Sequence, residues 1–281
     1  MNKKNFVVAV CAGHGLGTPG KRCMKALDPN ETREWVLNDR VARAFQERAE
    51  EYEGFVTVRM DDPTGRTDTP LQQRVELANA IEADLYWSPH HNAGIGGKDG
   101  PQHDGGIVAY CSKGSTRSPE WRDAIYDASI AAGGIKGNRT EPKARADWYV
   151  CKNTNMPSVL MEYGFMDSPD DVPIILDPEY SRRMGIAAAD AVAAKAGLKR
   201  KPTETTPPIE IPDEERRYNS VEELPDWAQE IISKLVSQDI IQGDELGRLD
   251  LSLDMVRIMM FVYRLPGVWR TLEPPVQVPE E

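Results

Sequence analysis

Histidines that follow strand-like segments could bind a metal ion in this chain. His14 comes after the apolar run 6–12 and lies between two glycines, and His90 and His91 follow a second strand-like run at 83–88. Short runs rich in β-branched and small apolar residues are typical of buried strands. Open α/β sheets bind their ligands beyond the carboxyl ends of such strands. The histidines are therefore expected near one edge of a sheet.

Two glutamates are candidates to act with these histidines. Glu34 lies near the start of a helix that the apolar spacing over 31–45 predicts, and Glu162 lies in a further apolar run at 157–166. Two histidine nitrogens and one carboxylate oxygen form a ligand set for catalytic zinc, with one position left for water. From its position alone, Glu34 is better explained as a solvated first-turn carboxylate. Glu162 is either a salt-bridged structural residue or a general base beside a metal.

The residues around the second strand end leave two choices open. Because adjacent side chains of a strand point to opposite faces, only one of His90 and His91 is expected to face the metal. Asn92 is expected either to orient the histidine ligand or to bind substrate. The cysteines are far apart and form no Cys-x-x-Cys pair, so we predict buried free thiols.

Strand-like and helix-like segments alternate up to residue 198. Further strands are expected at 55–59 and 107–111, and further helices at 70–81 and 119–132. This alternation is typical of an α/β domain, here assigned to residues 1–198.

The C-terminal part of the chain differs in composition. Residues 199–217 are proline-rich and charged, which predicts a semi-rigid linker. Beyond it, apolar residues at helical spacing predict two helices on either side of a turn at Gly243. Residues 218–281 are therefore expected to form a small all-helical module with a disordered tail.

The charge of the chain is unevenly placed. Of the net charge of −11, only −1 falls within residues 1–202. This distribution argues against nucleic acid or an anionic membrane surface as the main partner. The sequence contains no run of about 18 apolar residues that would span a membrane. We interpret the apolar run near the N-terminus as the first strand rather than a signal peptide, so synthesis in the cytoplasm without a secretion signal is expected.

Six short motifs follow one another along the domain: Gly13-His14-Gly15, Thr18 to Arg22, Arg33-Glu34-Trp35 with Asn38, Arg74 with Ala78-Asn79, Ser88 to Ala93, and Glu162 to Phe165. In this order and at this spacing, they resemble the motifs of the zinc N-acetylmuramoyl-L-alanine amidases of bacteria and phages, the amidase 3 type. The resemblance covers residues 6–197 and implies a twisted, mixed sheet of about six strands with helices on both faces.

The resemblance also implies the site residues. His14, Glu34 and His90 would bind Zn²⁺, with Glu31 as the alternative to Glu34, and Glu162 would be the catalytic carboxylate. The implied reaction is hydrolysis of the amide bond between N-acetylmuramic acid and L-alanine in bacterial peptidoglycan. The expected type is a phage endolysin, made in the host cytoplasm and acting on the cell wall after release. A zinc peptidase acting on stem peptides and a non-catalytic wall-binding protein are the alternatives.

Residues 218–281 resemble a single S-layer homology repeat, through Trp227-Ala228, Leu235, and Ile241 with Gly243. This likeness implies binding to a wall polymer. A small packing or self-association module is the alternative.

Overall fold

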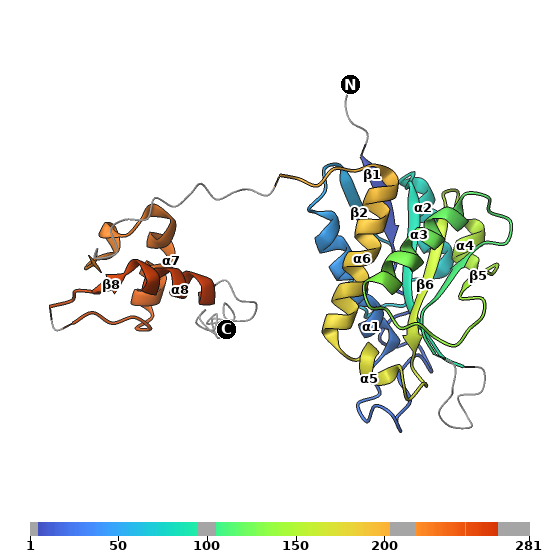
Figure 1. Ribbon diagram of the computed structural model, residues 1–281, viewed down its shortest axis with the longest axis horizontal. Helices are drawn as coiled ribbons and strands as arrows, with labels where there is room; N and C mark the ends of the chain where they lie inside the picture. Colours follow the sequence, from blue (N-terminus) through green and yellow to red (C-terminus); the bar gives the residue numbers. More distant parts are fainter. Residues whose placement is uncertain (1–4, 95–104, 203–216, 245, 264–281) are drawn as a thin grey trace, which may run out of the picture. The chain divides into compact units, whose positions relative to one another are not determined.

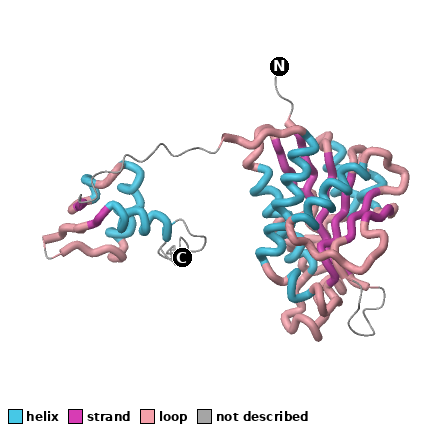
Figure 2. The backbone as a smooth tube through the Cα atoms, viewed as in Figure 1, coloured by secondary structure: helices cyan, strands magenta, loops and turns pink. Residues whose placement is uncertain are grey.

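The computed structural model describes residues 5–94, 105–202, 217–244 and 246–263, which form two compact units, Met1–Pro202 and Thr203–Glu281 (Figure 1). Strands are concentrated in the first unit, whereas two helices account for half of the described residues of the second (Figure 2). No helix within the described ranges is long and apolar enough to cross a bilayer.

A six-stranded sheet forms the centre of the first unit, with the strand order β2-β1-β3-β6-β4-β5. The strands are β1 (Phe6–Val10), β2 (Phe55–Arg59), β3 (Leu85–Asn92), β4 (Val108–Cys111), β5 (Lys143–Arg145) and β6 (Ser158–Phe165). Neighbouring strands are parallel except for the antiparallel pair of β4 and β6. The predicted mixed α/β sheet is therefore confirmed.

Helices pack against both faces of this sheet (Figure 1). One face is covered by α1 (Glu34–Ala49), α3 (Ser118–Ala131) and α6 (Pro178–Ala196), preceded by the short α5 (Val172–Ile175). The other face is covered by α2 (Leu71–Ala80) and α4 (Tyr149–Asn153).

The alternation of side chains along each strand assigns residues to these two cores. In β1, Val8 and Val10 pack on the side of α1, whereas Ala9 packs with α2. In β3, Trp87 stacks on Phe45 of α1 with ring centroids 4.2 Å apart. The central strands β1, β3 and β6 are buried on both faces and are nearly continuous apolar runs, which is why the sequence predicted them.

The structure contains elements that the sequence did not lead us to predict. β5, α4 and α5 were not predicted, because runs of three to five residues carry no measurable periodicity. The long helix α6 was not predicted as a separate element either. β3 continues to Asn92, beyond the expected end at residue 88, so both adjacent histidines lie within the strand.

The C-terminal unit contains the two predicted helices, α7 (Asp226–Ser237) and α8 (Leu253–Tyr263). It is not purely helical, which corrects the prediction: β7 (Arg217–Tyr218) pairs antiparallel with β8 (Leu251–Ser252), and a 3₁₀ turn spans Val221–Glu223. The strands form because Tyr218 and Leu251 enter the same apolar core as the helices.

The predicted linker lies largely outside the described residues. Of its described part, Lys199 and Lys201 hydrogen-bond through their backbones to Glu53 and Glu51, so they belong to the first unit. The predicted disordered tail falls mostly on residues 264–281, which the structure does not describe.

Candidate metal centre

His14 is presented by a tight loop directly after β1. Its backbone has φ 68°, a left-handed conformation that non-glycine residues rarely adopt. The guanidinium of Arg74, from α2, donates hydrogen bonds of 3.2 Å to the carbonyl oxygens of both Ala12 and His14. A side chain at Gly13 would place its Cβ 2.0 Å from Cε1 of His90. The glycine and the arginine together allow His14 to approach His90.

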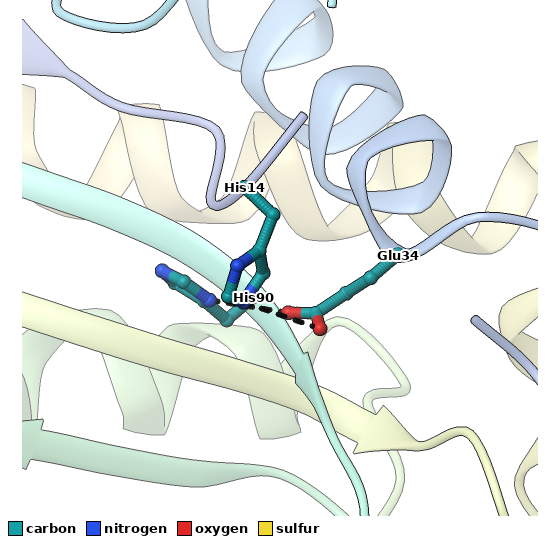
Figure 3. A group of neighbouring side chains, drawn as sticks. All are labelled: His14, Glu34 and His90. Carbon is teal, nitrogen blue, oxygen red and sulfur yellow. Dashed lines mark hydrogen bonds and ion pairs between the residues drawn. The ribbon is translucent and has the colours of Figure 1, made fainter. Parts of the chain in front are cut away.

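Glu34 is the first residue of α1 and is fully buried. Its carboxylate lies 3.3 Å from Nε2 of His14 and 3.1 Å from Nδ1 of His90 (Figure 3). Burial alone would raise the pKa of Glu34, but hydrogen bonds with both histidines outweigh it and hold the pKa well below its usual range. The interpretation of Glu34 as a solvated carboxylate is therefore wrong. Glu31 lies elsewhere and pairs with Arg22 at 3.0 Å.

The adjacent histidines of β3 point to opposite faces of the sheet, as predicted. His90 faces Glu34, whereas the buried ring of His91 lies on the other side, with Nδ1 2.8 Å from Oδ1 of Asn38. Since that oxygen can only accept, Nδ1 of His91 donates. Burial lowers the pKa of His91 to about 3, so this histidine is neutral.

Three side chains from separate elements thus converge on one point (Figure 3). His14, Glu34 and His90 each offer a ligand atom, and these atoms all lie within 4.8 Å of one another. Two imidazole nitrogens and an ionised carboxylate are a donor set that suits a zinc ion. These residues could therefore hold a metal ion together.

Asn38 supports this cluster, a role that the sequence analysis did not assign. Its Nδ2 donates to Oε1 of Glu34 at 3.4 Å and to the carbonyl of Gly13 at 3.1 Å. The helix that carries Glu34 is thereby tied to the loop that carries His14. Its position four residues after Glu34, on the same helix face, was the available signal.

Arg74→Lys is expected to weaken metal binding about 10- to 100-fold, the usual effect of losing a group that orients a ligand. Lysine keeps the charge but cannot reach at once the carbonyl oxygens of Thr69, Ala12 and His14, all of which Arg74 binds. Competition with a chelator measures the affinity. The exposed Arg66, replaced in the same way, is the control, and equal affinities for both variants would contradict this role.

The cluster opens into a cavity of about 540 Å³ on the face of the sheet that α2 and α4 cover. Glu162 lines this cavity and lies opposite His90 in the ladder of β3 and β6. Its Oε2 atom is buried and has no hydrogen-bond partner among the described residues. Burial, assisted by the charge of Glu34, raises the pKa of Glu162 to about 8. Oε2 of Glu162 makes no salt bridge within the described part of the chain, so the alternative of a salt-bridged structural glutamate is not supported.

Asn92, the remaining candidate, makes no hydrogen bond to the ligand cluster among the described residues. Asn92 lines the cavity, and its Oδ1 accepts from the backbone N–H of Ala93 at 2.8 Å. Asn38, rather than Asn92, makes the hydrogen bonds that order the cluster.

All the cysteines are buried and free, as predicted, and burial raises the pKa of Cys23 to about 12. That thiol is therefore protonated near neutral pH.

A family model described as N-acetylmuramoyl-L-alanine amidase, Amidase_3, matches residues 8–194. The chain belongs to this family. The matched range contains the whole cluster of His14, Glu34 and His90 together with Glu162.

Curated relatives of the amidase match over part of their length. The endolysin of Bacillus phage SPP1 is 34% identical over 131 residues, which are 47% of this chain and 47% of that protein. The N-acetylmuramoyl-L-alanine amidase CwlM of Bacillus licheniformis is 26% identical over 131 residues, 46% of this chain and 47% of that protein. The match thus spans about half the length of these relatives.

Solved amidase structures share the fold. The N-acetylmuramoyl-L-alanine amidase from Clostridium difficile 630 superposes with a TM-score of 0.60 at 21% identity, covering 69% of this chain and 98% of that chain. The catalytic domain of CwlV from Bacillus (Paenibacillus) polymyxa gives a TM-score of 0.59 at 21% identity. This match covers 70% of this chain and 100% of that domain. These likenesses confirm the predicted architecture of the sheet and its helices.

Proposed function

We propose that this amidase uses zinc to hydrolyse the bond between N-acetylmuramic acid and L-alanine in bacterial peptidoglycan. The observation that carries the proposal is that the cluster of His14, Glu34 and His90 borders a cavity, which His14 and His90 line together with Glu162. Family membership supports the choice of substrate, and the likeness to the SPP1 endolysin supports a lytic role on the cell wall after release.

The chain offers the ligands in a fixed arrangement. His14 would hold zinc through Nε2 and His90 through Nδ1, because these are the atoms that face the Glu34 carboxylate. When bound, zinc supplies the Lewis acidity that acidifies water and polarises an amide carbonyl. Asn38 and Arg74 keep the ligands oriented through their contacts with Glu34 and with the backbone of His14.

Glu162 is proposed to move the proton. Its partnerless Oε2 can accept a proton from the attacking water, and the protonated carboxyl can then donate it to the departing amine of L-alanine. Burial raises the pKa of Glu162, which makes its carboxylate a stronger base, and the same group, once protonated, is the acid that returns the proton. One residue can therefore serve both halves of the hydrolysis.

Mass spectrometry of digested peptidoglycan tests the bond that is cut. An amidase should release peptides with a free N-terminal L-alanine and leave the glycan strands intact. Fragments in which L-alanine stays on muramic acid would instead identify a zinc peptidase acting on stem peptides. Intact peptidoglycan would leave the third alternative, a non-catalytic wall-binding protein.

The role of residues 218–281 stays a prediction. Binding to a wall polymer would be consistent with an enzyme that acts on walls, because tethering raises the local concentration of substrate. Self-association through this module is the other possibility that the sequence suggested.

A further inference from the structure

The hydrolytic mechanism leaves two aromatic side chains beside the cavity without a role. Trp148 is 49% exposed and Tyr149 is 43% exposed, and both line the cavity that contains Glu162. In the described part of the first unit, no other tryptophan is comparably exposed, and Trp35 and Trp87 are core residues. Large aromatic surfaces are stabilised when they are covered, so their exposure at a cavity suggests a ligand that covers them.

The Trp148 side chain is held in place. The Trp148 ring meets the ring of Tyr110 edge-on, with centroids 6.0 Å apart and an interplanar angle of 84°. The preceding residue, Asp147, accepts a hydrogen bond of 3.2 Å from the backbone N–H of Lys113. The backbone carbonyl of Trp148 accepts from Lys152 in the first turn of α4. A surface that is already ordered loses little entropy on binding.

The strand order places the aromatic group at one end of the site. His14 follows β1, His90 is on β3, Glu162 is on β6 and Tyr110 is on β4, and these four strands are consecutive neighbours in the sheet. Glu162 therefore lies between the metal ligands and the aromatic side chains. At the opposite end, the ammonium of Lys21 lies 3.4 Å from Oε2 of Glu34 and lines the same cavity.

The two ends match the two halves of the substrate, and this step rests on the proposed function. On one side of the scissile amide is an uncharged N-acetylated sugar, whose ring has apolar C–H faces. On the other side is a peptide that carries carboxylates. Aromatic faces pack against the C–H faces of sugar rings, whereas an ammonium group attracts carboxylates.

We infer that Trp148, Tyr149 and Tyr110 form the subsite for the N-acetylmuramic acid ring. The stem peptide then extends from the metal ligands toward Lys21. The aromatic group determines which way the substrate lies across Glu162, so it acts in binding and orientation and takes no part in proton transfer.

Trp148→Ala is the direct test in the full-length, zinc-loaded protein. The KM for a soluble muropeptide should rise about 10-fold with kcat changed less than about 2-fold, because a contact that binds substrate and transition state equally changes KM and leaves kcat unchanged. Trp148→Phe should restore most of the affinity. Leu77→Ala, which removes an exposed apolar side chain of α2 that does not line the cavity, is the control. An unchanged KM in Trp148→Ala would overturn the inference.

Binding without turnover separates this inference from the proposed function. In saturation-transfer NMR, the peptide-free disaccharide of N-acetylglucosamine and N-acetylmuramic acid, with its lactyl carboxyl group amidated so that it is uncharged, should receive signal from wild type and from Leu77→Ala, and lose it in Trp148→Ala. A free stem peptide should bind all three proteins equally. Loss of peptide binding instead would assign the aromatic group to the peptide and overturn the sugar subsite. Cleavage of a different bond, with sugar binding intact, would refute the proposed function alone.

Discussion

His90→Ala should yield protein without zinc and without measurable hydrolysis, whereas His91→Ala should retain about one zinc per chain. The reason is the alternation along β3, which directs His90 to the carboxylate of Glu34 and His91 to Asn38 on the other side. Removing one of three protein ligands leaves a site that cannot hold the metal tightly. Elemental analysis of the purified proteins, together with muropeptide hydrolysis, measures both effects.

His91→Ala is the matched control because the two histidines are neighbours on the same strand. It should cost stability, on the order of 2 kcal/mol, since it removes a buried ring and leaves the Asn38 amide oxygen without its donor. Thermal unfolding distinguishes this loss from a loss of metal. Zinc retained in His90→Ala and lost in His91→Ala would reverse the assignment of the ligand.

The ligand cluster could be predicted because each member stands at the end or the start of a regular element. His14 and His90 are marked by apolar runs that end beside them, and Glu34 is marked by the start of an amphipathic helix. These signals are local, so the sequence carries them. Assigning the three residues to a single site required the family resemblance, because the distances between strand ends are set by the whole sheet.

Other features of the site are not local and were not predicted. The left-handed conformation of His14 depends on donors from Arg74, which lies 60 residues away in the chain. The helix α4, which carries Tyr149 beside the cavity, has five residues and no recognisable period. The two-residue strands of the C-terminal unit were not predicted, because only their pairing with each other, between residues distant in the sequence, defines them.

Glu162→Gln should retain zinc and fold normally, yet lose at least ~10²-fold in kcat, because a glutamine amide is nearly isosteric but cannot accept the proton from water. The structure makes a loss of stability unexpected, since Oε2 of Glu162 has no hydrogen-bond partner among the described residues whose bond would be broken. Stopped assays on a soluble muropeptide measure the rate. Zinc analysis checks that the metal is retained, and thermal unfolding checks that the stability of the fold is unchanged.

The exposed Glu141, replaced by glutamine, is a control for the chemical change itself. If Glu162→Gln kept the wild-type rate, Glu162 would only line the cavity, and another group would have to accept the proton from the attacking water. If it lost zinc as well as rate, Glu162 would contribute to the ligand cluster. A selective loss of kcat, with zinc content and melting temperature unchanged, is the result that a proton-transfer role requires, because that role alone acts on the transition state and on neither the metal nor the fold.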